Sequence, residues 1–278
     1  TTIQGYKKIK KYAFQDIMDL PLKKITNKTL SDAVINESKR ISKNSKKADP
    51  KPISAKTVHN EYGLITAVLN TYYSSLDVTT RLPKIDPKDK EILPPDVIYS
   101  IVKGTEIELA VMLAMWLSFS ESEIRGLTKS NSISGDYLII KEVVVDVDGK
   151  PVRKSQAKNV TRKRALRIPP YIKSLIDKVE TDELVTISGK ALYARFTKLL
   201  KRNGLPHMTF HDLRHVNASV MGLLRIPDKY AQDRGGWKTD HVMKKVYTHT
   251  FTEERLAVDS KIDDYFQKMI QHETQHEK

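Results

Sequence analysis

Apolar residues recur at helical spacing through the first 82 residues of the chain. They form three stripes, marked by Ile3, Tyr6, Ile9 and Ala13, then by Leu30, Val34 and Ile41, and then by Val58, Ile65, Val68, Leu69 and Tyr72. Asn27 and Ser54 stand where they can cap the second and third of these helices. Residues 1–82 are therefore predicted to form a small helical domain.

Residues 83–95 are rich in proline and charge, which is typical of a linker, and residues 96–278 are predicted to form a second domain. Its pattern is mostly helical, with helices expected over residues 96–103, 106–119, 169–179, 188–202, 211–224, 228–234, 240–247 and 252–270. Residues 136–147 are apolar and β-branched and precede a turn at Asp148-Gly149, so a hairpin is expected there, with a third strand at residues 166–168. The predicted fold class is mainly α with a small antiparallel β-sheet.

The charge balance of the chain adds an indication of its binding partner. The 278-residue chain has 48 Lys and Arg against 34 Asp and Glu, a formal net charge of +14. The residues up to Leu82 hold 15 of the basic and 7 of the acidic side chains, so they carry over half of the surplus. Such a surplus favours a polyanion such as nucleic acid. The candidate backbone contacts in this domain are Lys43, Lys46, Lys47 and Lys56.

Composition also excludes several classes. Cysteine is absent, so disulfides, thiolate metal sites and a cysteine nucleophile are excluded, and a reducing cytoplasm is a fitting location. No apolar run approaches the length of a membrane span, and no signal-peptide pattern is present. The chain starts with Thr1 rather than Met, already at a helix start, so we expect an N-terminal segment to have been removed.

Four residues in the last quarter of the chain suit one chemistry: His211, Arg214, Trp237 and Tyr247. His211 and Arg214 are three residues apart, so on a helix they project from one face. A guanidinium fork beside an imidazole suits a phosphate that is gaining charge, and a tyrosine hydroxyl can be the attacking group. The combination indicates metal-free phosphoryl transfer on a nucleic-acid backbone. His211 and His215 also have a metal-ligand spacing, but the glutamate of a zinc motif and a third ligand are missing.

The ordered set His211-Asp212-Leu213-Arg214-His215, Gly235-Gly236-Trp237 and Tyr247-Thr248-His249 resembles the second conserved box of the tyrosine recombinases, the phage-integrase family. The resemblance covers nearly the whole chain and points to integrases of Gram-positive phages or integrative elements. It implies a two-domain DNA clamp, in which a helical core-binding domain is followed by an α+β catalytic domain.

The resemblance also implies a role for each residue of the set. Tyr247 would attack the scissile phosphate, forming a 3′-phosphotyrosyl link and releasing a 5′-hydroxyl, and because the link conserves bond energy neither ATP nor metal is needed. Arg214 would hold the non-bridging phosphate oxygens, and His211 would assist as a hydrogen-bond donor or proton acceptor. Trp237 stands where many relatives carry histidine, and its indole N–H can donate a hydrogen bond but cannot transfer a proton.

Residues 150–167 contain eight basic side chains and no acid. By resemblance, Lys158 would be the general acid that protonates the leaving 5′-oxygen, because the family places a lysine on the β-hairpin ahead of a basic stretch and an Ile-Pro. Lys154 and Lys163 are competitors for that role. The basic residues of this stretch are also candidate contacts to the DNA backbone, namely Lys154, Arg162, Lys163 and Arg164.

The sequence departs from the family at its first conserved box. Aligning Ser122-Glu123 and Leu127 with the family pattern places Ser120 where a catalytic arginine is usual. A serine hydroxyl cannot supply a positive charge. Arg125 is nearby, but five residues along a helix place it about 140° around the axis. Either Arg125 reaches the site because the helix ends near Gly126, or another basic group fills the gap, or the chain cleaves slowly or not at all.

The partners implied by the resemblance are double-stranded DNA, three further copies of the chain and a small accessory DNA-bending protein. A homotetramer would form through the predicted C-terminal helix, whose apolar residues extend from Leu256 to Met269. The leading hypothesis is a site-specific DNA recombinase. Two alternatives are a topoisomerase-like nicking and closing enzyme that uses the same tyrosine chemistry, and an inactive DNA-binding relative, for which Ser120 is the argument.

Overall fold

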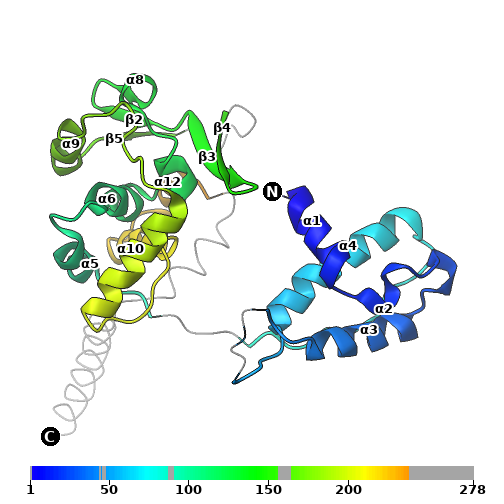
Figure 1. Cartoon of the computed structure of the whole chain (residues 1–278). Coiled ribbons are helices and arrows are strands. Elements are labelled where there is room, and N and C mark those ends of the chain that lie inside the picture. Colours follow the sequence, from blue (N-terminus) through cyan, green and yellow to red (C-terminus); the bar gives the residue numbers. More distant parts are fainter. Residues whose placement is uncertain (1, 44, 46–47, 87–90, 156–163, 238–278) are drawn as a thin grey trace, which may run out of the picture. The chain divides into compact units, whose positions relative to one another are not determined.

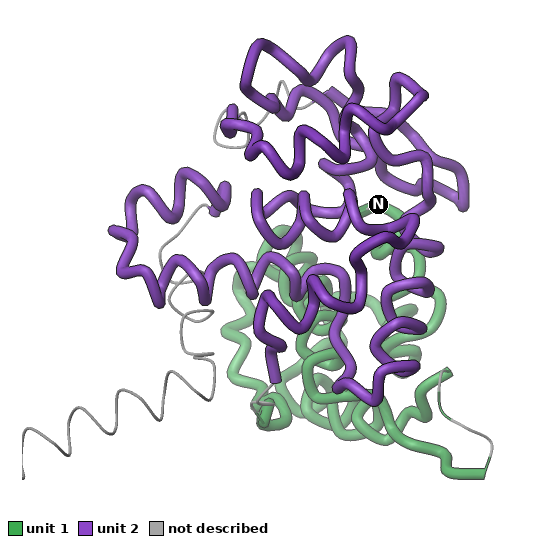
Figure 2. The backbone as a smooth tube through the Cα atoms, turned by 90° about the vertical axis from the view of Figure 1, so that its left-hand side faces the viewer, with its two compact units in different colours: residues 1–89 green, residues 90–278 purple. Residues whose placement is uncertain are grey.

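The computed structural model describes residues 2–43, 45, 48–86, 91–155 and 164–237. The chain divides into two compact units, Thr1–Asp89 and Lys90–Lys278 (Figure 2), and the boundary falls inside the predicted linker. The helices expected over residues 240–247 and 252–270 lie outside the described residues. Within the described part of the chain, no helix has the length and apolar character needed to cross a membrane.

The first unit is helical (Figure 1). Its elements are α1 (Thr2–Tyr12), α2 (Gln15–Met18), the 3-10 turn η1 (Leu22–Lys24), α3 (Asn27–Lys39) and α4 (Ala55–Tyr72). Phe14, Leu30 and Leu69 are fully buried between these helices, and the Phe14 ring contacts that of Tyr62 with centroids 5.8 Å apart. Each apolar stripe of the sequence thus contributes to one small core, but part of each stripe is exposed: Ile3, Tyr6, Ile41, Val68 and Tyr72.

One of the two predicted helix caps in the first unit is confirmed, and the other is wrong. Ser54 caps α4 as predicted, because its hydroxyl accepts a hydrogen bond from the Thr57 backbone N–H at 3.2 Å. Thr26, not Asn27, caps α3, since the Thr26 and Thr29 hydroxyls bond reciprocally to each other's backbone N–H. The Asn27 amide instead bonds the backbone of residues 77 and 79.

The second unit is built around α6 (Glu108–Leu117), which is buried on almost every side. The other helices are α5 (Pro95–Val102), α7 (Glu121–Ile124), α8 (Lys129–Ser132), α9 (Pro170–Asp177), α10 (Gly189–Arg202), α11 (Asp212–Leu223) and α12 (Asp228–Gly235). α5, α7, α9 and α11 pack against α6. Ser188 caps α10 as predicted, accepting from the Ala191 N–H. The four-residue helix α8 was not expected from the sequence, whereas α7 lies where a helix ending near Gly126 was considered.

The strands form two sheets, whereas the sequence predicted one. β1 (Ile133–Ser134), β2 (Tyr137–Ile139) and β5 (Ala165–Arg167) form an antiparallel sheet in the order β1-β2-β5. β3 (Glu142–Val147) and β4 (Lys150–Ser155) form a separate hairpin. The predicted strand 136–147 is therefore divided, because its first part lies between β1 and β5 and its second part pairs with β4 alone. The turn at Asp148-Gly149 is confirmed, with φ of 52° and 78°.

The hairpin meets the body of the unit at α7. A Cβ atom on Gly126, just after α7, would lie 2.3 Å from the backbone oxygen of Glu142 in β3, so only glycine allows this approach. Arg153 of β4 reaches back and donates from Nη1 to the Gly126 carbonyl at 2.9 Å. The junction between α7 and the hairpin is thus fixed by backbone packing.

Candidate active site

The turn between α6 and α7 provides a buried acceptor. Ser118 ends α6 in the left-handed conformation, with φ of 57°. Its carbonyl oxygen accepts hydrogen bonds from Nη2 of Arg164 at 2.8 Å and from Nη1 of Arg214 at 2.5 Å. Two guanidinium groups, from residues 50 positions apart in the chain, therefore meet at one main-chain oxygen.

A carboxylate lies beside the same two arginines. Glu123 in α7 is 3% exposed, and its Oε2 lies 3.3 Å from Nη2 of Arg164 and 3.3 Å from Nη1 of Arg214. The backbone N–H of Ser120, which precedes α7, donates to the same oxygen at 2.7 Å. Among the residues that the structure describes, one negative charge thus faces two positive charges, so this part of the cluster has a net positive charge.

Arg214 is fixed by the chain on both sides of its guanidinium. It lies in the first turn of α11 and is 7% exposed. Its Nη2 donates to the carbonyl of Gly235 at 2.7 Å, and its Cζ lies 5.8 Å from the centroid of the Trp237 ring. The structure therefore brings together two of the four residues that the sequence predicted to share one chemistry, Arg214 and Trp237.

Gly235 and Gly236 make room for two of these side chains. A Cβ on Gly235 would lie 2.2 Å from the Trp237 ring, and a Cβ on Gly236 would lie 2.1 Å from Nη1 of Arg164. Gly236 also has φ of 66°, which favours glycine. The glycine pair of the sequence motif is thus explained by the tryptophan ring on one side and a guanidinium on the other.

His211 and His215 lie at the start of α11. His211 is the exposed N-cap residue, and its ring meets that of half-buried His215 edge to face with centroids 5.3 Å apart. The Arg214 N–H donates to the His211 carbonyl at 3.1 Å, so the predicted spacing places both residues in one turn.

Arg164 has different surroundings from those expected of a DNA-backbone contact. The sequence grouped it with the basic residues of the hairpin region, but it is 7% exposed and lies against Ser118, Glu123 and Gly236. Its Cζ also lies 5.2 Å from the centroid of the Phe119 ring. No sequence signal marks this position, because the residues it contacts are 41 or more positions away.

Arg125 does not join this cluster. α7 ends at Ile124, and the Arg125 guanidinium pairs with Asp146 of β3, at 2.8 Å and 3.1 Å, and with Glu121 at 3.1 Å. Arg125 is 7% exposed, and its hydrogen bonds hold the pKa of the Asp146 carboxyl below its usual range. Arg125 therefore joins α7 to the hairpin.

This pair gives a pH-dependent prediction. An aspartate with a lowered pKa stabilises the folded chain above its unfolded-state pKa of about 4 and loses that contribution as pH falls through the lowered value. Asp146→Asn should therefore lower the melting temperature at pH 7, and the difference from wild type should shrink as pH falls below about 4. Asp136→Asn, at an exposed turn, is the control. A difference of equal size at pH 3 and pH 7 would contradict the prediction.

The remaining predicted site residues are exposed or lie outside the described part. Lys154 on β4 and Lys56 on α4 are exposed, and exposed Lys43 places its Nζ 3.2 Å from the centroid of the Tyr12 ring. The residues that lie outside the described part are Lys46, Lys47, Lys158, Arg162, Lys163 and Tyr247.

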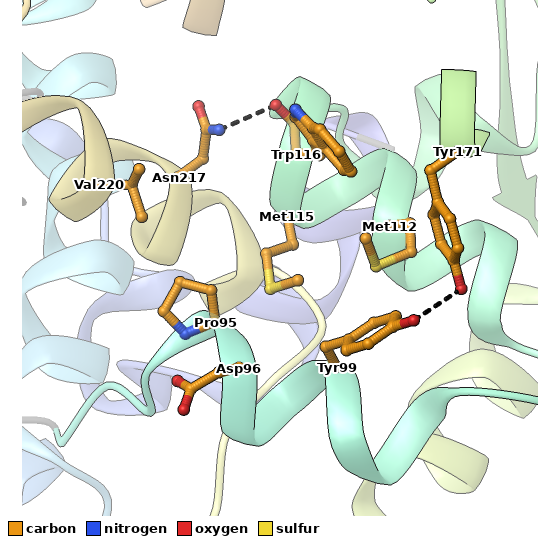
Figure 3. Close-up of a pocket in the computed structure, with 9 residues that line it drawn as sticks. All are labelled: Pro95, Asp96, Tyr99, Met112, Met115, Trp116, Tyr171, Asn217 and Val220. Atoms are coloured by element: carbon orange, nitrogen blue, oxygen red, sulfur yellow. Dashed lines mark hydrogen bonds between the residues drawn. The ribbon is translucent and has the colours of Figure 1, made fainter. Parts of the chain in front are cut away.

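A second, apolar site lies between α5, α6, α9 and α11 of the second unit (Figure 3). This cavity of about 510 Å³ is lined mainly by apolar and aromatic side chains, among them Met112, Met115 and Trp116. The Tyr99 hydroxyl donates to that of Tyr171 at 3.2 Å, and the Tyr171 hydroxyl donates to Glu108 at 2.5 Å, which raises the pKa of Tyr171. The cavity has few polar groups, so it suits an apolar segment better than a reacting phosphate.

Comparison with known proteins covers most of the chain. The family model described as Phage integrase family matches residues 108–254. A curated relative, the Tyrosine recombinase XerC-like protein of Caldanaerobacter subterraneus subsp. tengcongensis, is 21% identical over 203 residues, which is 61% of this chain and 52% of the relative. The chain thus spans about half the length of that relative.

Two solved structures share the fold. The Tn1549 transposon integrase, in complex with a circular intermediate DNA, matches with a TM-score of 0.72 and 15% identity, over 94% of this chain and 93% of that one. A lambda integrase dimer bound to a COC′ core site matches with a TM-score of 0.60 and 20% identity, over 89% and 88% of the two chains. At these identities the likeness shows the fold: a mostly helical unit with small antiparallel sheets, as the sequence predicted.

Proposed function

Because the chain belongs to the phage integrase family, we propose that it is a site-specific DNA recombinase that cuts and rejoins DNA strands through a tyrosine. The observation that carries this proposal is the position of Arg214. Its guanidinium is fixed by two main-chain carbonyls, of Ser118 and Gly235, beside the Trp237 ring and in a cluster of net positive charge. A fixed fork of N–H donors with surplus positive charge suits a phosphate diester that gains charge during transfer.

In each step of the proposed reaction, one P–O bond forms and one P–O bond breaks. The Tyr247 hydroxyl oxygen attacks the scissile phosphorus, a tyrosyl P–O bond forms, and the bond from phosphorus to the 5′-oxygen breaks. His211 accepts the proton of the Tyr247 hydroxyl, and Lys158 gives the leaving 5′-oxygen its proton. Arg214 and Trp237 donate hydrogen bonds to the phosphate oxygens. A 5′-hydroxyl of another strand then attacks the phosphotyrosyl link, which releases Tyr247 and rejoins the DNA. In this second step the two proton transfers run in reverse. Protein side chains alone supply each of these groups, so the proposal involves neither metal nor ATP.

The proposed partner is double-stranded DNA, held by both units as by a clamp. The basic surplus of residues 1–82 and the exposed side chains of Lys43, Lys56 and Lys154 support this partner. We further propose a homotetramer on DNA, formed when the apolar C-terminal segment docks on a neighbouring copy. The apolar cavity between α5 and α11 is a surface of fitting chemistry for such a segment. An accessory DNA-bending protein and a bacterial cytoplasmic location belong to the same proposal.

The test is a selection for covalent capture. A pool of nicked duplexes with a randomised central segment is incubated with the protein in EDTA without nucleotide. Complexes that survive detergent are recovered and sequenced, and the modified peptide is identified by mass spectrometry. We expect a defined duplex to be enriched and the adduct to map to Tyr247.

The control for this selection is Tyr247→Phe, which keeps the ring but lacks the attacking oxygen. If wild type retains no more DNA than this control in any pool, the chain is a DNA-binding relative without activity. If an adduct forms with every sequence alike and the complex stays monomeric, the topoisomerase-like alternative replaces the recombinase.

A further inference from the structure

The active site lacks one positive charge where its family has an arginine, at position 120. Ser120 is half-buried, and its hydroxyl lies 3.3 Å from that of Ser122. Arg125 does not replace the missing group, because its guanidinium is paired with Asp146 on the hairpin side of α7. The described residues nevertheless place a second guanidinium beside Arg214, and it belongs to Arg164.

Position 120 and Arg164 meet at a single atom. Oε2 of Glu123 accepts from the Ser120 backbone N–H at 2.7 Å and lies 3.3 Å from Nη2 of Arg164. The same oxygen lies 3.3 Å from Nη1 of Arg214. The Arg164 guanidinium and the backbone at position 120 therefore approach the same carboxylate oxygen, which also faces the arginine predicted to hold the phosphate.

The two guanidinium groups are held in matched ways. Each donates to the Ser118 carbonyl, and each is 7% exposed. Each also lies against an aromatic ring, Arg164 on Phe119 and Arg214 on Trp237. Arg164 is thus as fixed, and as accessible, as the residue assigned to phosphate binding. Such fixed donors lose little entropy when an anion arrives.

Charge also favours an anion at this point. Nη2 of Arg164 and Nη1 of Arg214 both donate to the Ser118 carbonyl oxygen, so the distance between these two nitrogens is no more than the sum of the two hydrogen-bond lengths. Two cations this close repel each other, and among the described residues one carboxylate, that of Glu123, lies between them and offsets half of their charge. A phosphate with two non-bridging oxygens matches the charge that is left, and it can accept from both forks.

The glycine before Trp237 supports the same assignment. Gly236 leaves room for Nη1 of Arg164, where any Cβ would lie 2.1 Å away. The chain just before Trp237 is therefore shaped around this guanidinium. We propose that Arg164 is a catalytic residue that binds the scissile phosphate and takes the place of the arginine absent at position 120. This inference rests on the proposed recombinase function.

The experiment measures the single-turnover rate of covalent complex formation on the duplex selected above. Arg164→Lys keeps the charge beside Glu123 but removes the fork, and we expect the rate to fall by ~10²–10³, the usual cost of losing one such donor. The rate of Arg164→Gln should fall by at least as much. Adding Ser120→Arg to Arg164→Gln should recover part of the rate. Arg167→Gln, at an exposed position three residues along in β5, should cleave like wild type.

A further substrate separates catalysis from folding. A neutral methylphosphonate at the scissile position lowers the need for positive charge. The difference in cleavage rate between wild type and Arg164→Lys should therefore be smaller on this substrate than on the phosphate diester. If Arg164→Lys is folded by circular dichroism and cleaves at the wild-type rate, or if that difference is equal on both substrates, Arg164 only braces Glu123 and the inference is overturned while the function stands. If wild type itself forms no adduct, the proposed function fails and the inference with it.

Discussion

Glu123→Ala is expected to lower the free energy of unfolding by about 3–5 kcal/mol, the usual cost of removing one partner from a buried ion pair. The carboxylate is 3% exposed and is the acid that faces both Arg164 and Arg214. Without it, two like charges remain close together around the Ser118 carbonyl, and the Ser120 N–H loses its acceptor. For a unit of this size the melting temperature should fall by roughly 10 °C. Calorimetry measures both quantities.

The control is Glu121→Ala in the same helix. Glu121 is 39% exposed and pairs with Arg125 at 3.1 Å, so its loss should cost no more than about 1 kcal/mol. Equal shifts for the two variants would show that Glu123 has no special place between the arginines.

Arg214→Lys is expected to slow covalent complex formation by ~10²–10³, although the charge is retained. Two nitrogens of the guanidinium bond the carbonyls of Ser118 and Gly235, and this geometry aims the rest of the group. An ammonium group has one nitrogen and cannot keep both contacts. The measurement is single-turnover cleavage of the selected duplex, with filter binding to show that DNA affinity is retained.

Arg195→Lys is the matched control, since Arg195 lies on α10, is half-buried and forms one ion pair within the described part of the chain, with Glu106 at 2.7 Å. It should cleave like wild type. A folded Arg214→Lys protein that also cleaves like wild type would remove Arg214 from the active site.

Local signals in the sequence predicted much of the fold. Ser54 and Ser188 cap their helices because a serine hydroxyl satisfies the first free N–H groups whatever the surroundings. The Asp148-Gly149 turn follows from the conformational preferences of those two residues. The division of residues 136–147 between two sheets was not predictable in this way, because it depends on which distant strands, β5 and β4, pair with each part.

The site was predictable only where its residues are neighbours in the sequence. His211 and Arg214 are one helical turn apart, and Gly235, Gly236 and Trp237 are consecutive. Arg164 was grouped with surface residues because charge in a basic stretch usually faces solvent. Its contacts with Ser118 and Glu123 depend on the folding that brings residue 164 to the turn between α6 and α7, which no local pattern records.

Because the β3–β4 hairpin joins the second unit mainly at Gly126, it can be exchanged as one segment. The hairpin meets the body through the backbone at Gly126, the Arg153 bond to the Gly126 carbonyl and the Asp146 pair with Arg125. Its strands pair with each other and with neither β1, β2 nor β5. We expect that a hairpin of another length or sequence can replace it without disturbing the β1-β2-β5 sheet, provided that it keeps three contacts: an acid opposite Arg125, an arginine that reaches the Gly126 carbonyl, and a close approach of its backbone to Gly126. Chimeras that exchange residues 142–155 are thus a practical way to change the contacts that the hairpin makes with a partner.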